Sequence, residues 1–172
     1  IKILQMANTM NSNVFNNSEG FAVTTQLSFP RNWGLGTSST LINNIAQWFQ
    51  IDAFELLQQS FGGSGYDIAC AQNNNPITYV LLDGKPRVEK VVFKPEFAQN
   101  LYFVYLNQKR NSKSAIAEYH SNKTSQLSSY ITTINELTQG IIKANNLEIF
   151  SQLITQHETV LSEILKTETV KN

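Results

Sequence analysis

A glycine-rich turn that leads into a helical pattern constrains the fold of this chain most strongly. The turn is "PRNWGLGTSST" (30–40), and the run "LINNIAQWF" after it has apolar residues at helical spacing. This spacing predicts a helix that begins directly after the turn. Before the turn, "FAVTTQLSF" (21–29) alternates apolar and polar residues imperfectly and predicts a strand that ends at Pro30. The sequence therefore predicts strand, glycine loop and helix in this order.

A second glycine turn, "GGSGYD" (62–67), lies between two further predicted helices. Before it, Asp52 and Glu55 form a D-x-x-E pattern that is typical of a capped helix start. After it, "IACAQ" is compatible with a short helix. Asp67 thus stands at a predicted helix start, where it can act as a base or simply cap its own helix.

The remaining chain predicts a hairpin, a third strand and helices. Two strand-like runs flank Asp83-Gly84 in "ITYVLLDGKPRVEKVVF", a strong hairpin signal, and "NLYFVYLN" (100–107) predicts another strand. From Ser112 onward, apolar residues at a 3.6-residue period predict two helices. We expect an α+β fold, in which a boundary near residues 108–112 separates a mixed part from a helical part, or both share one core.

The first ten residues, "IKILQMANTM", also have helical spacing. They look like the middle of a helix, and the chain begins at Ile1 rather than methionine. We therefore expect it to be part of a longer protein.

Composition indicates a globular chain with a substantial core. Of 172 residues 41% are hydrophobic, and 13 basic residues balance 13 acidic ones. Without a basic excess, nucleic acid is not an expected partner. The single cysteine, Cys70, allows no internal disulfide and is expected to be a small buried residue. No apolar run reaches about 18 residues and no signal peptide is visible, so we expect a cytoplasmic protein that does not enter a membrane.

The first glycine loop has the chemistry of a phosphate site. Gly34 and Gly36 allow the backbone to turn closely around an anion, and the helix after them offers unpaired N–H groups. The hydroxyls that follow, from Thr37 to Thr40, can bond phosphate oxygens or bind Mg²⁺. Glycine turns and hydroxyl residues are also ordinary helix starts, so the loop alone is open to both interpretations. Asp67 in the second turn favours a site for phosphoryl transfer.

Together the two turns resemble the GHMP small-molecule kinases. Pro30 with "GLGTSST" is similar to their phosphate-binding motif, P-x-x-x-G-L-G-S-S-A-A. "GSGYDIACA" looks like the segment that holds the catalytic aspartate in the mevalonate and phosphomevalonate kinase branches. The resemblance covers only the middle of such a kinase, because neither the family's N-terminal motif nor its glycine-rich C-terminal motif is found here.

The resemblance implies a role for each matching residue. Asp67 would orient the attacking hydroxyl of the substrate and Ser38 would bind Mg²⁺. Glu55 falls close to the family's second Mg²⁺ ligand, although the capping pattern with Asp52 explains it equally well. The residues implied to bind the ATP phosphates are Gly34, Leu35, Gly36, Thr37, Ser38 and Ser39. Thr37 keeps the hydroxyl of the family's serine, whereas Ser39 and Thr40 replace two alanines.

The fold implied by the resemblance is truncated at both ends. Residues 1–75 would be the last part of the nucleotide-binding N-terminal domain, an α/β domain like the second domain of ribosomal protein S5. Residues 76–172 would begin a ferredoxin-like α+β C-terminal domain.

The implied function is a kinase that uses ATP and Mg²⁺ to phosphorylate a small metabolite. The form of the aspartate segment favours mevalonate or phosphomevalonate, and therefore isoprenoid precursor synthesis. The alternative is a noncatalytic member that binds a nucleotide or metabolite as a sensor or scaffold. A homodimer is compatible with either.

Overall fold

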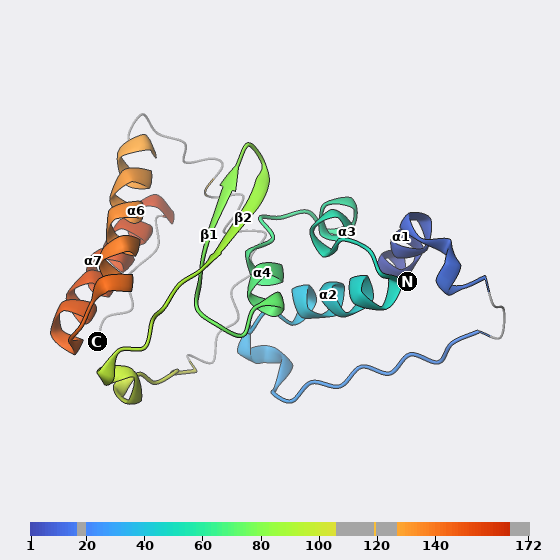
Figure 1. The fold of residues 1–172 in the computed structure, drawn as a ribbon, viewed down its shortest axis with the longest axis horizontal. Helices are drawn as coiled ribbons and strands as arrows, with labels where there is room; N and C mark the ends of the chain where they lie inside the picture. The colour runs from blue at the N-terminus through green and yellow to red at the C-terminus, as the bar shows by residue number, and fades with distance from the viewer. Residues whose placement is uncertain (17–19, 106–118, 120–126, 166–172) are drawn as a thin grey trace. The chain divides into compact units, whose positions relative to one another are not determined.

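The computed structural model describes residues 1–16, 20–105, 119 and 127–165. Among these residues are six α-helices and one antiparallel sheet of two strands, so the protein is α+β, as predicted. The chain divides into two compact units, Ile1–Val91 and Val92–Asn172 (Figure 1). Each unit is described by itself.

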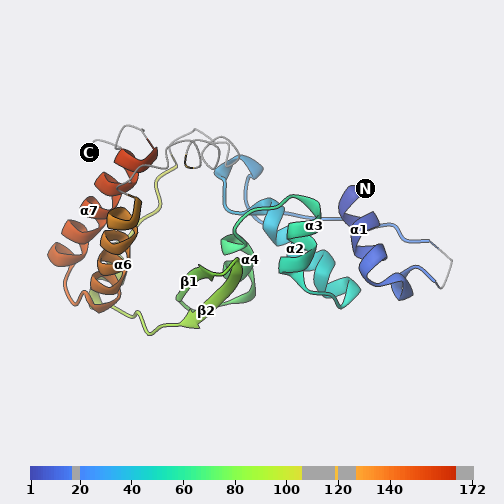
Figure 2. The same ribbon diagram turned by 90° about the horizontal axis from the view of Figure 1, so that it is seen from above.

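The first unit contains four α-helices, and the sequence predicted all of them. Their bounds are α1 (Lys2–Met10), α2 (Thr37–Phe49), α3 (Ala53–Ser60) and α4 (Tyr66–Gln72). α1 packs against α2 and α3, and α2 also packs against α3 and α4. In Figures 1 and 2 the start of α2 lies beside α4. The two predicted glycine turns therefore lead into helices that touch.

The core of the first unit fixes the starts of these two helices. Its largest fully buried side chains are Phe49 and Ile42 of α2, Leu56 of α3 and Ile68 of α4. Burial of each such side chain contributes about 1.5–3 kcal/mol to stability. Ile42 and Ile68 both lie within two turns of the beginning of their helices. The same apolar contacts that fold the unit thus also position its two glycine turns.

A two-stranded hairpin completes the first unit. Strands β1 (Ile77–Leu82) and β2 (Lys85–Lys90) pair antiparallel, with Leu82 opposite Lys85. Asp83 and Gly84 between them have φ angles of 51° and 74°, the left-handed values of a two-residue hairpin turn. The predicted hairpin is confirmed, and β1 contacts α4.

The predicted strand at 21–29 is wrong. Residues 20–29 pair with no strand, and Phe21, Val23 and Leu27 are exposed. Alternating residues form a strand only where a sheet edge accepts them, and in the described part of the chain β1 and β2 pair only with each other. The glycine loop is instead preceded by an unpaired segment and one 3₁₀ turn, Arg31–Trp33.

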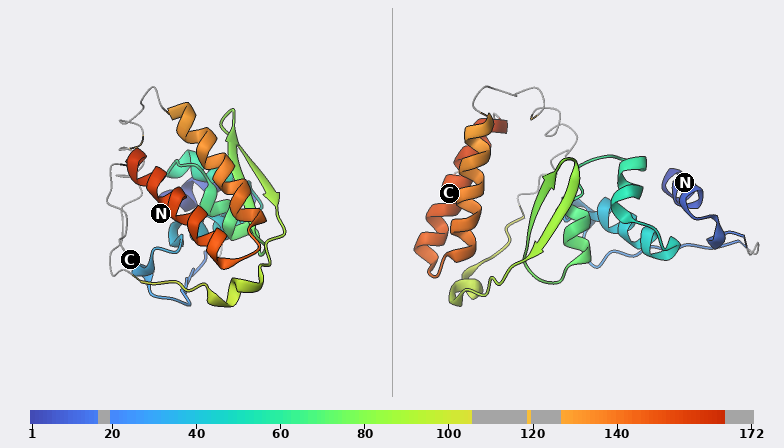
Figure 3. Two further views of the ribbon diagram at one scale, coloured as in Figure 1. Left: turned by 90° about the vertical axis from the view of Figure 1, so that its left-hand side faces the viewer. Right: turned by 45° about the horizontal axis from the view of Figure 1, so that its top comes forward.

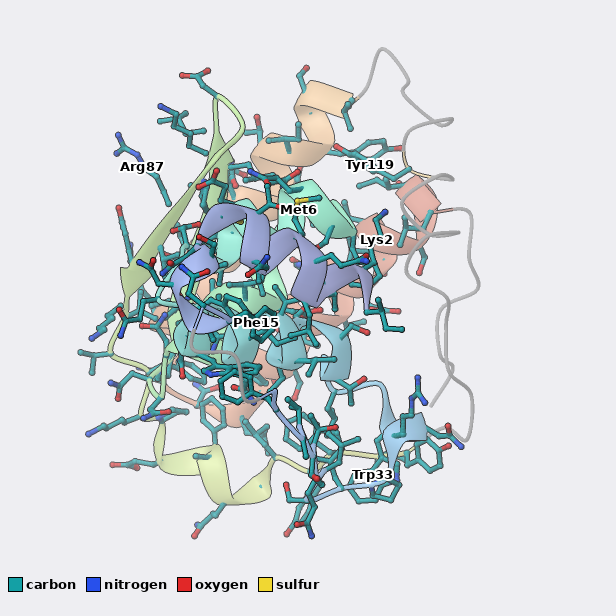
Figure 4. The ribbon with its side chains drawn as sticks, turned by 90° about the vertical axis from the view of Figure 1, so that its right-hand side faces the viewer. Lys2, Met6, Phe15, Trp33, Arg87 and Tyr119 are labelled. Carbon is teal, nitrogen blue, oxygen red and sulfur yellow. The ribbon has the colours of Figure 1, made fainter. Side chains whose placement is uncertain are left out.

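Phe21 packs against aromatic rings rather than in a sheet. Its ring centroid lies 5.3 Å from that of Trp48 in an edge-to-face arrangement, and 5.7 Å from that of Phe15. Phe15 lies edge-on to Phe49 at 5.1 Å. In Figure 4, Phe15 lies among the packed side chains, whereas Trp33 lies at the border of the unit. These rings attach the segment after α1 to the far end of α2.

The second unit contains a helical hairpin. The helices are α6 (Leu127–Lys143) and α7 (Leu147–Leu165), which run side by side (Figure 3). Both were predicted, but α6 continues past Gly140, where a methyl group would lie 3.2 Å from Cδ2 of Leu153. Their apolar stripes are only partly covered, since Leu137 is buried whereas Ile154 is 41% exposed. No helix in the described residues is both long and apolar enough to cross a membrane.

The predicted third strand at 100–107 is also wrong in its described part. Asn100 is the last residue of a 3₁₀ helix, Glu96–Asn100, and Leu101–Tyr105 is exposed and pairs with no strand. Residues 106 and 107 lie outside the described residues. An apolar run satisfies strand propensity, but its backbone needs a partner that the described part of this chain does not supply.

Candidate functional site

The first glycine loop ends in two left-handed residues. Gly34 closes the 3₁₀ turn with φ 75°, and Gly36 precedes α2 with φ 68°. Residues with a Cβ rarely adopt this conformation, which explains why glycine occupies both positions. Leu35 between them is exposed. The loop therefore presents its backbone to solvent at the beginning of α2.

The N-terminus of α2 has no side-chain cap. Gly36 is the N-cap residue and has no side chain that could accept a hydrogen bond. No hydrogen bond within the described chain occupies the backbone N–H groups of Thr37, Ser38 or Ser39. Such groups, together with the positive end of the helix dipole, favour an anion. This end of a 13-residue helix thus has the properties expected of a phosphate site.

The hydroxyls of the first turn of α2 differ in what they bond. Thr40 Oγ1 donates to the carbonyl oxygen of Gly36 at 3.1 Å, so this side chain closes the turn. Ser38 is exposed, and no described residue hydrogen-bonds to its hydroxyl. Thr37 and Ser39 are half-buried. Of the four hydroxyls, that of Ser38 is the most available to a ligand.

Asp67 does not cap its own helix. Gly65 is the N-cap of α4, and Asp67 is the second residue of the helix. Its carboxylate is exposed rather than bonded to the backbone, so the capping interpretation of Asp67 is wrong.

Asp67 lies directly beside Gly36. A methyl group placed on Gly36 would lie 3.7 Å from both Cβ and Cγ of Asp67, and 3.9 Å from its Oδ2. The structure thus brings the carboxylate of the second turn to the glycine that begins α2. Two predicted site residues from separate turns form one cluster.

The second turn is held tightly at Gly65. A methyl group there would lie only 2.7 Å from Cδ1 of Phe54 and 3.4 Å from the hydroxyl oxygen of Tyr79. Gly65 is buried and has φ 83°. The Tyr79 hydroxyl also donates a hydrogen bond to the carbonyl oxygen of Ser64. Residues of α3 and β1 therefore fix the turn that carries Asp67.

Cys70 is exposed, which corrects the prediction that it is buried. It lies one turn after Tyr66 on the short helix α4. The pKa of the Tyr66 phenol is raised above its ordinary value of 10.0, first by a hydrogen bond with the Cys70 side chain and then by partial burial, with further contributions from the charges of Cys70 and Asp67. Tyr66 is therefore a neutral neighbour of Asp67 at physiological pH.

Asp52 is the N-cap of α3, as predicted, and its Oδ1 accepts from the backbone N–H of Glu55 at 2.7 Å. The Glu55 carboxylate does not return the bond to Asp52; it accepts from Nε2 of Gln59 at 2.9 Å. The capping pattern thus explains the position of Asp52 and leaves the Glu55 side chain exposed on α3. No hydrogen bond links Glu55 to the described residues of the glycine loop.

Sequence reasoning missed Phe54 and Tyr79. It expected the Thr40 hydroxyl to be available to phosphate or Mg²⁺, whereas this hydroxyl donates to the carbonyl oxygen of Gly36. Phe54 and Tyr79 act through tertiary contacts with Gly65, and no local pattern marks them. Thr40 has a recognisable signal, because threonine near a helix start often bonds back to the carbonyl four residues earlier.

The donors near Gly36 are compatible with Mg²⁺ bound together with phosphate. Mg²⁺ commonly takes one or two protein oxygens and completes its shell with phosphate oxygens and water. Ser38 supplies a hydroxyl and Asp67 a carboxylate. Within the described residues no group of three or more histidine, cysteine or acidic side chains forms a ready metal site. Any metal here would depend on the phosphates for part of its coordination.

Comparison with known proteins gives no relative. No protein-family model, curated protein sequence or solved structure matches this chain.

Proposed function

We propose that this chain contains the phosphate-binding and catalytic residues of an ATP- and Mg²⁺-dependent small-molecule kinase of the GHMP type. The observation that carries the proposal is the position of Asp67 against Gly36. A carboxylate held beside an uncapped helix start is the arrangement that phosphoryl transfer needs, because the reaction depends mainly on positioning and on charge stabilisation.

Each residue has a distinct task in this proposal. The backbone N–H groups at the start of α2, with the loop from Gly34 to Ser39, bind the phosphates of ATP. Ser38, with Glu55 as a second candidate, holds Mg²⁺, which neutralises charge on the phosphate oxygens when bound. Asp67 orients the attacking oxygen of the acceptor, a hydroxyl or a phosphate oxygen, in line with the γ-phosphate and takes the proton where that oxygen is a hydroxyl. As the new P–O bond forms, the bond between the γ-phosphorus and the β-phosphate oxygen breaks and ADP leaves.

The acceptor we propose is mevalonate or phosphomevalonate. Support for this choice comes from the form of "GSGYD" alone. The GHMP-like fold, with an N-terminal nucleotide domain and a ferredoxin-like C-terminal domain, belongs to the same proposal. The α+β content and the helix after each glycine turn support it.

The decisive experiment is a coupled assay of ADP formation with the full-length protein. Mevalonate, phosphomevalonate, homoserine and galactose are offered in turn with Mg²⁺ and ATP. We expect turnover with one of the first two, and a loss of at least about 100-fold in kcat for Asp67→Asn with ATP affinity nearly unchanged. Asp83→Asn in the hairpin turn is the matched control and should retain activity.

Two results would contradict the proposal. Turnover of none of the four acceptors, with ATP still bound, would favour a nucleotide-binding sensor or scaffold. Equal activity of Asp67→Asn and the wild type would remove Asp67 from the reaction.

A further inference from the structure

We propose that Tyr79 is a positioning residue for Asp67, because its hydroxyl fixes the Ser64–Gly65 turn and so sets where Asp67 meets Gly36. The inference rests on the proposed function, in which Asp67 orients the phosphoryl acceptor. It adds a residue from β1 to a site otherwise built from two helix starts.

Besides its strand pairing with Val88 of β2, Tyr79 contacts this turn and the helix after it. Its hydroxyl donates to the carbonyl oxygen of Ser64. The hydroxyl oxygen would also lie 3.4 Å from a methyl group on Gly65. Its ring meets that of Tyr66, the first residue of α4, edge-on with the centroids 5.7 Å apart. Tyr79 therefore touches the three residues that precede Asp67.

Phe54 of α3 packs against the same turn. Cδ1 of Phe54 is so close to Gly65 that a methyl group would come within 2.7 Å of it. Phe54 of α3 and Tyr79 of β1 thus both lie beside the Cβ position of Gly65. Loss of the Tyr79 hydroxyl would remove the hydrogen bond to Ser64 and leave the contact from Phe54 in place.

A small displacement at Gly65 reaches Asp67 directly. α4 begins at Tyr66, so Asp67 lies in the first turn of a helix attached to Gly65. Misplacement of a catalytic group by about 1 Å can cost as much as about 100-fold in rate. Partial burial also raises the pKa of Tyr79 above 10.0, so its hydroxyl is a protonated donor at neutral pH.

The test compares two matched tyrosine variants of the full-length protein. Tyr79→Phe removes only the hydroxyl that bonds Ser64 and keeps the ring. Tyr66→Phe removes the other hydroxyl of the same aromatic pair and keeps its ring. We expect Tyr79→Phe to lower kcat about tenfold with the KM for ATP unchanged, and Tyr66→Phe to change neither. A merely structural role would lower Tm without this difference between kcat and KM.

A second readout does not require activity. The backbone amide of Gly36 reports the position of Asp67, because the three heavy atoms nearest to a methyl group on Gly36 belong to Asp67. In NMR spectra, Tyr79→Phe should shift this amide resonance and Tyr66→Phe should not. If the wild type phosphorylates no acceptor, the proposed function fails while this comparison still decides the role of Tyr79. An unmoved Gly36 resonance, or wild-type kcat, in Tyr79→Phe would overturn the inference.

Discussion

Gly36 and Asp67 lie against each other at the starts of two different helices, close enough that a methyl group on Gly36 would touch Cβ of Asp67 at 3.7 Å. The uncapped N–H groups of α2 attract an anion, whereas the carboxylate of Asp67 repels one. Both tendencies are compatible in one site only if a cation or a proton lies between the anion and Asp67. This relationship leads us to expect that phosphate binding here depends on Mg²⁺.

Replacement of Gly36 by alanine should weaken ATP binding more than it weakens the fold. The new methyl group occupies the space between the loop and Asp67, and φ 68° is strained for alanine by about 1 kcal/mol. We expect the ATP affinity to fall at least about tenfold in calorimetry, and the unfolding free energy to fall by about 1 kcal/mol in urea denaturation.

Gly84→Ala is the matched control for Gly36→Ala. Gly84 has φ 74° in the hairpin turn, and no heavy atom lies within 4 Å of a methyl group there. Gly84→Ala should lower the unfolding free energy by the same amount as Gly36→Ala and leave ATP binding intact. Equal loss of ATP affinity in the two variants would show that backbone strain, not the contact with Asp67, causes the effect.

Gly65→Ala should destabilise the first unit strongly. The methyl group would lie 2.7 Å from Cδ1 of Phe54, and φ 83° adds backbone strain, for a total of about 2–4 kcal/mol. Urea denaturation measures the loss. Gly63→Ala, with φ 117° and no atom within 4 Å of the methyl group, should suffer the strain alone.

A double variant tests the contact between Gly65 and Phe54 directly. Phe54→Leu removes ring atoms that the new methyl group would meet, so Gly65→Ala should cost less in its presence. Strictly additive losses in the double-mutant cycle would mean that the ring does not cause the destabilisation.

The sequence predicted the local elements of this site and not the contacts that assemble it. Glycine turns, helical periods and the Asp83-Gly84 hairpin are encoded by neighbouring residues, and they were predicted correctly. Strand pairing depends on a partner distant in sequence, so the expected strands at 21–29 and 100–107 failed where they are described. The contacts of Phe54 and Tyr79 with Gly65 are equally nonlocal, and no spacing in the chain signals them.

Asp52→Ala should remove the N-terminal cap of α3. The Oδ1 atom of Asp52 accepts from the backbone N–H of Glu55 at 2.7 Å, and loss of such a cap costs about 0.5–2 kcal/mol. Asp52→Asn keeps an acceptor oxygen and should remain close to the wild type in urea denaturation. If the asparagine variant loses as much as the alanine variant, charge rather than the cap bond stabilises this end.

The ionisation of Tyr66 should report on its neighbours. Its hydrogen bond with Cys70 is the largest cause of its raised pKa, followed by burial, and the charge of Asp67 is the last. Cys70→Ala should therefore lower the pKa of Tyr66 more than Asp67→Asn does. Ultraviolet absorbance titration follows the phenolate, with Tyr66→Phe identifying its signal. The reverse order would contradict the assignment of the Cys70 bond.

The same shift predicts a loss of stability in alkali. Between the unfolded pKa near 10.0 and the higher folded pKa, the folded state binds more protons than the unfolded state, so the unfolding free energy falls as pH rises. The stabilisation that this pKa shift supplies is fully present below pH 10.0, and it is absent in Tyr66→Phe. Urea denaturation of both proteins across this range should show a steeper decline in the wild type; parallel curves would contradict the shift.

Ser38→Ala should reduce the dependence of ATP binding on Mg²⁺ without loss of stability. The Ser38 hydroxyl is exposed and bonds to no described residue, so its removal leaves the fold intact. We expect ATP affinity in the presence of Mg²⁺ to fall about tenfold and affinity in EDTA to stay the same, since only the metal-bound state uses the hydroxyl. Thr40→Val is the control, because the Thr40 hydroxyl already bonds the Gly36 carbonyl.

Glu55→Gln separates the two explanations of Glu55. A Mg²⁺-dependent loss of ATP affinity like that of Ser38→Ala would assign Glu55 to the metal. Unchanged ATP affinity would limit Glu55 to its bond with Gln59 in α3.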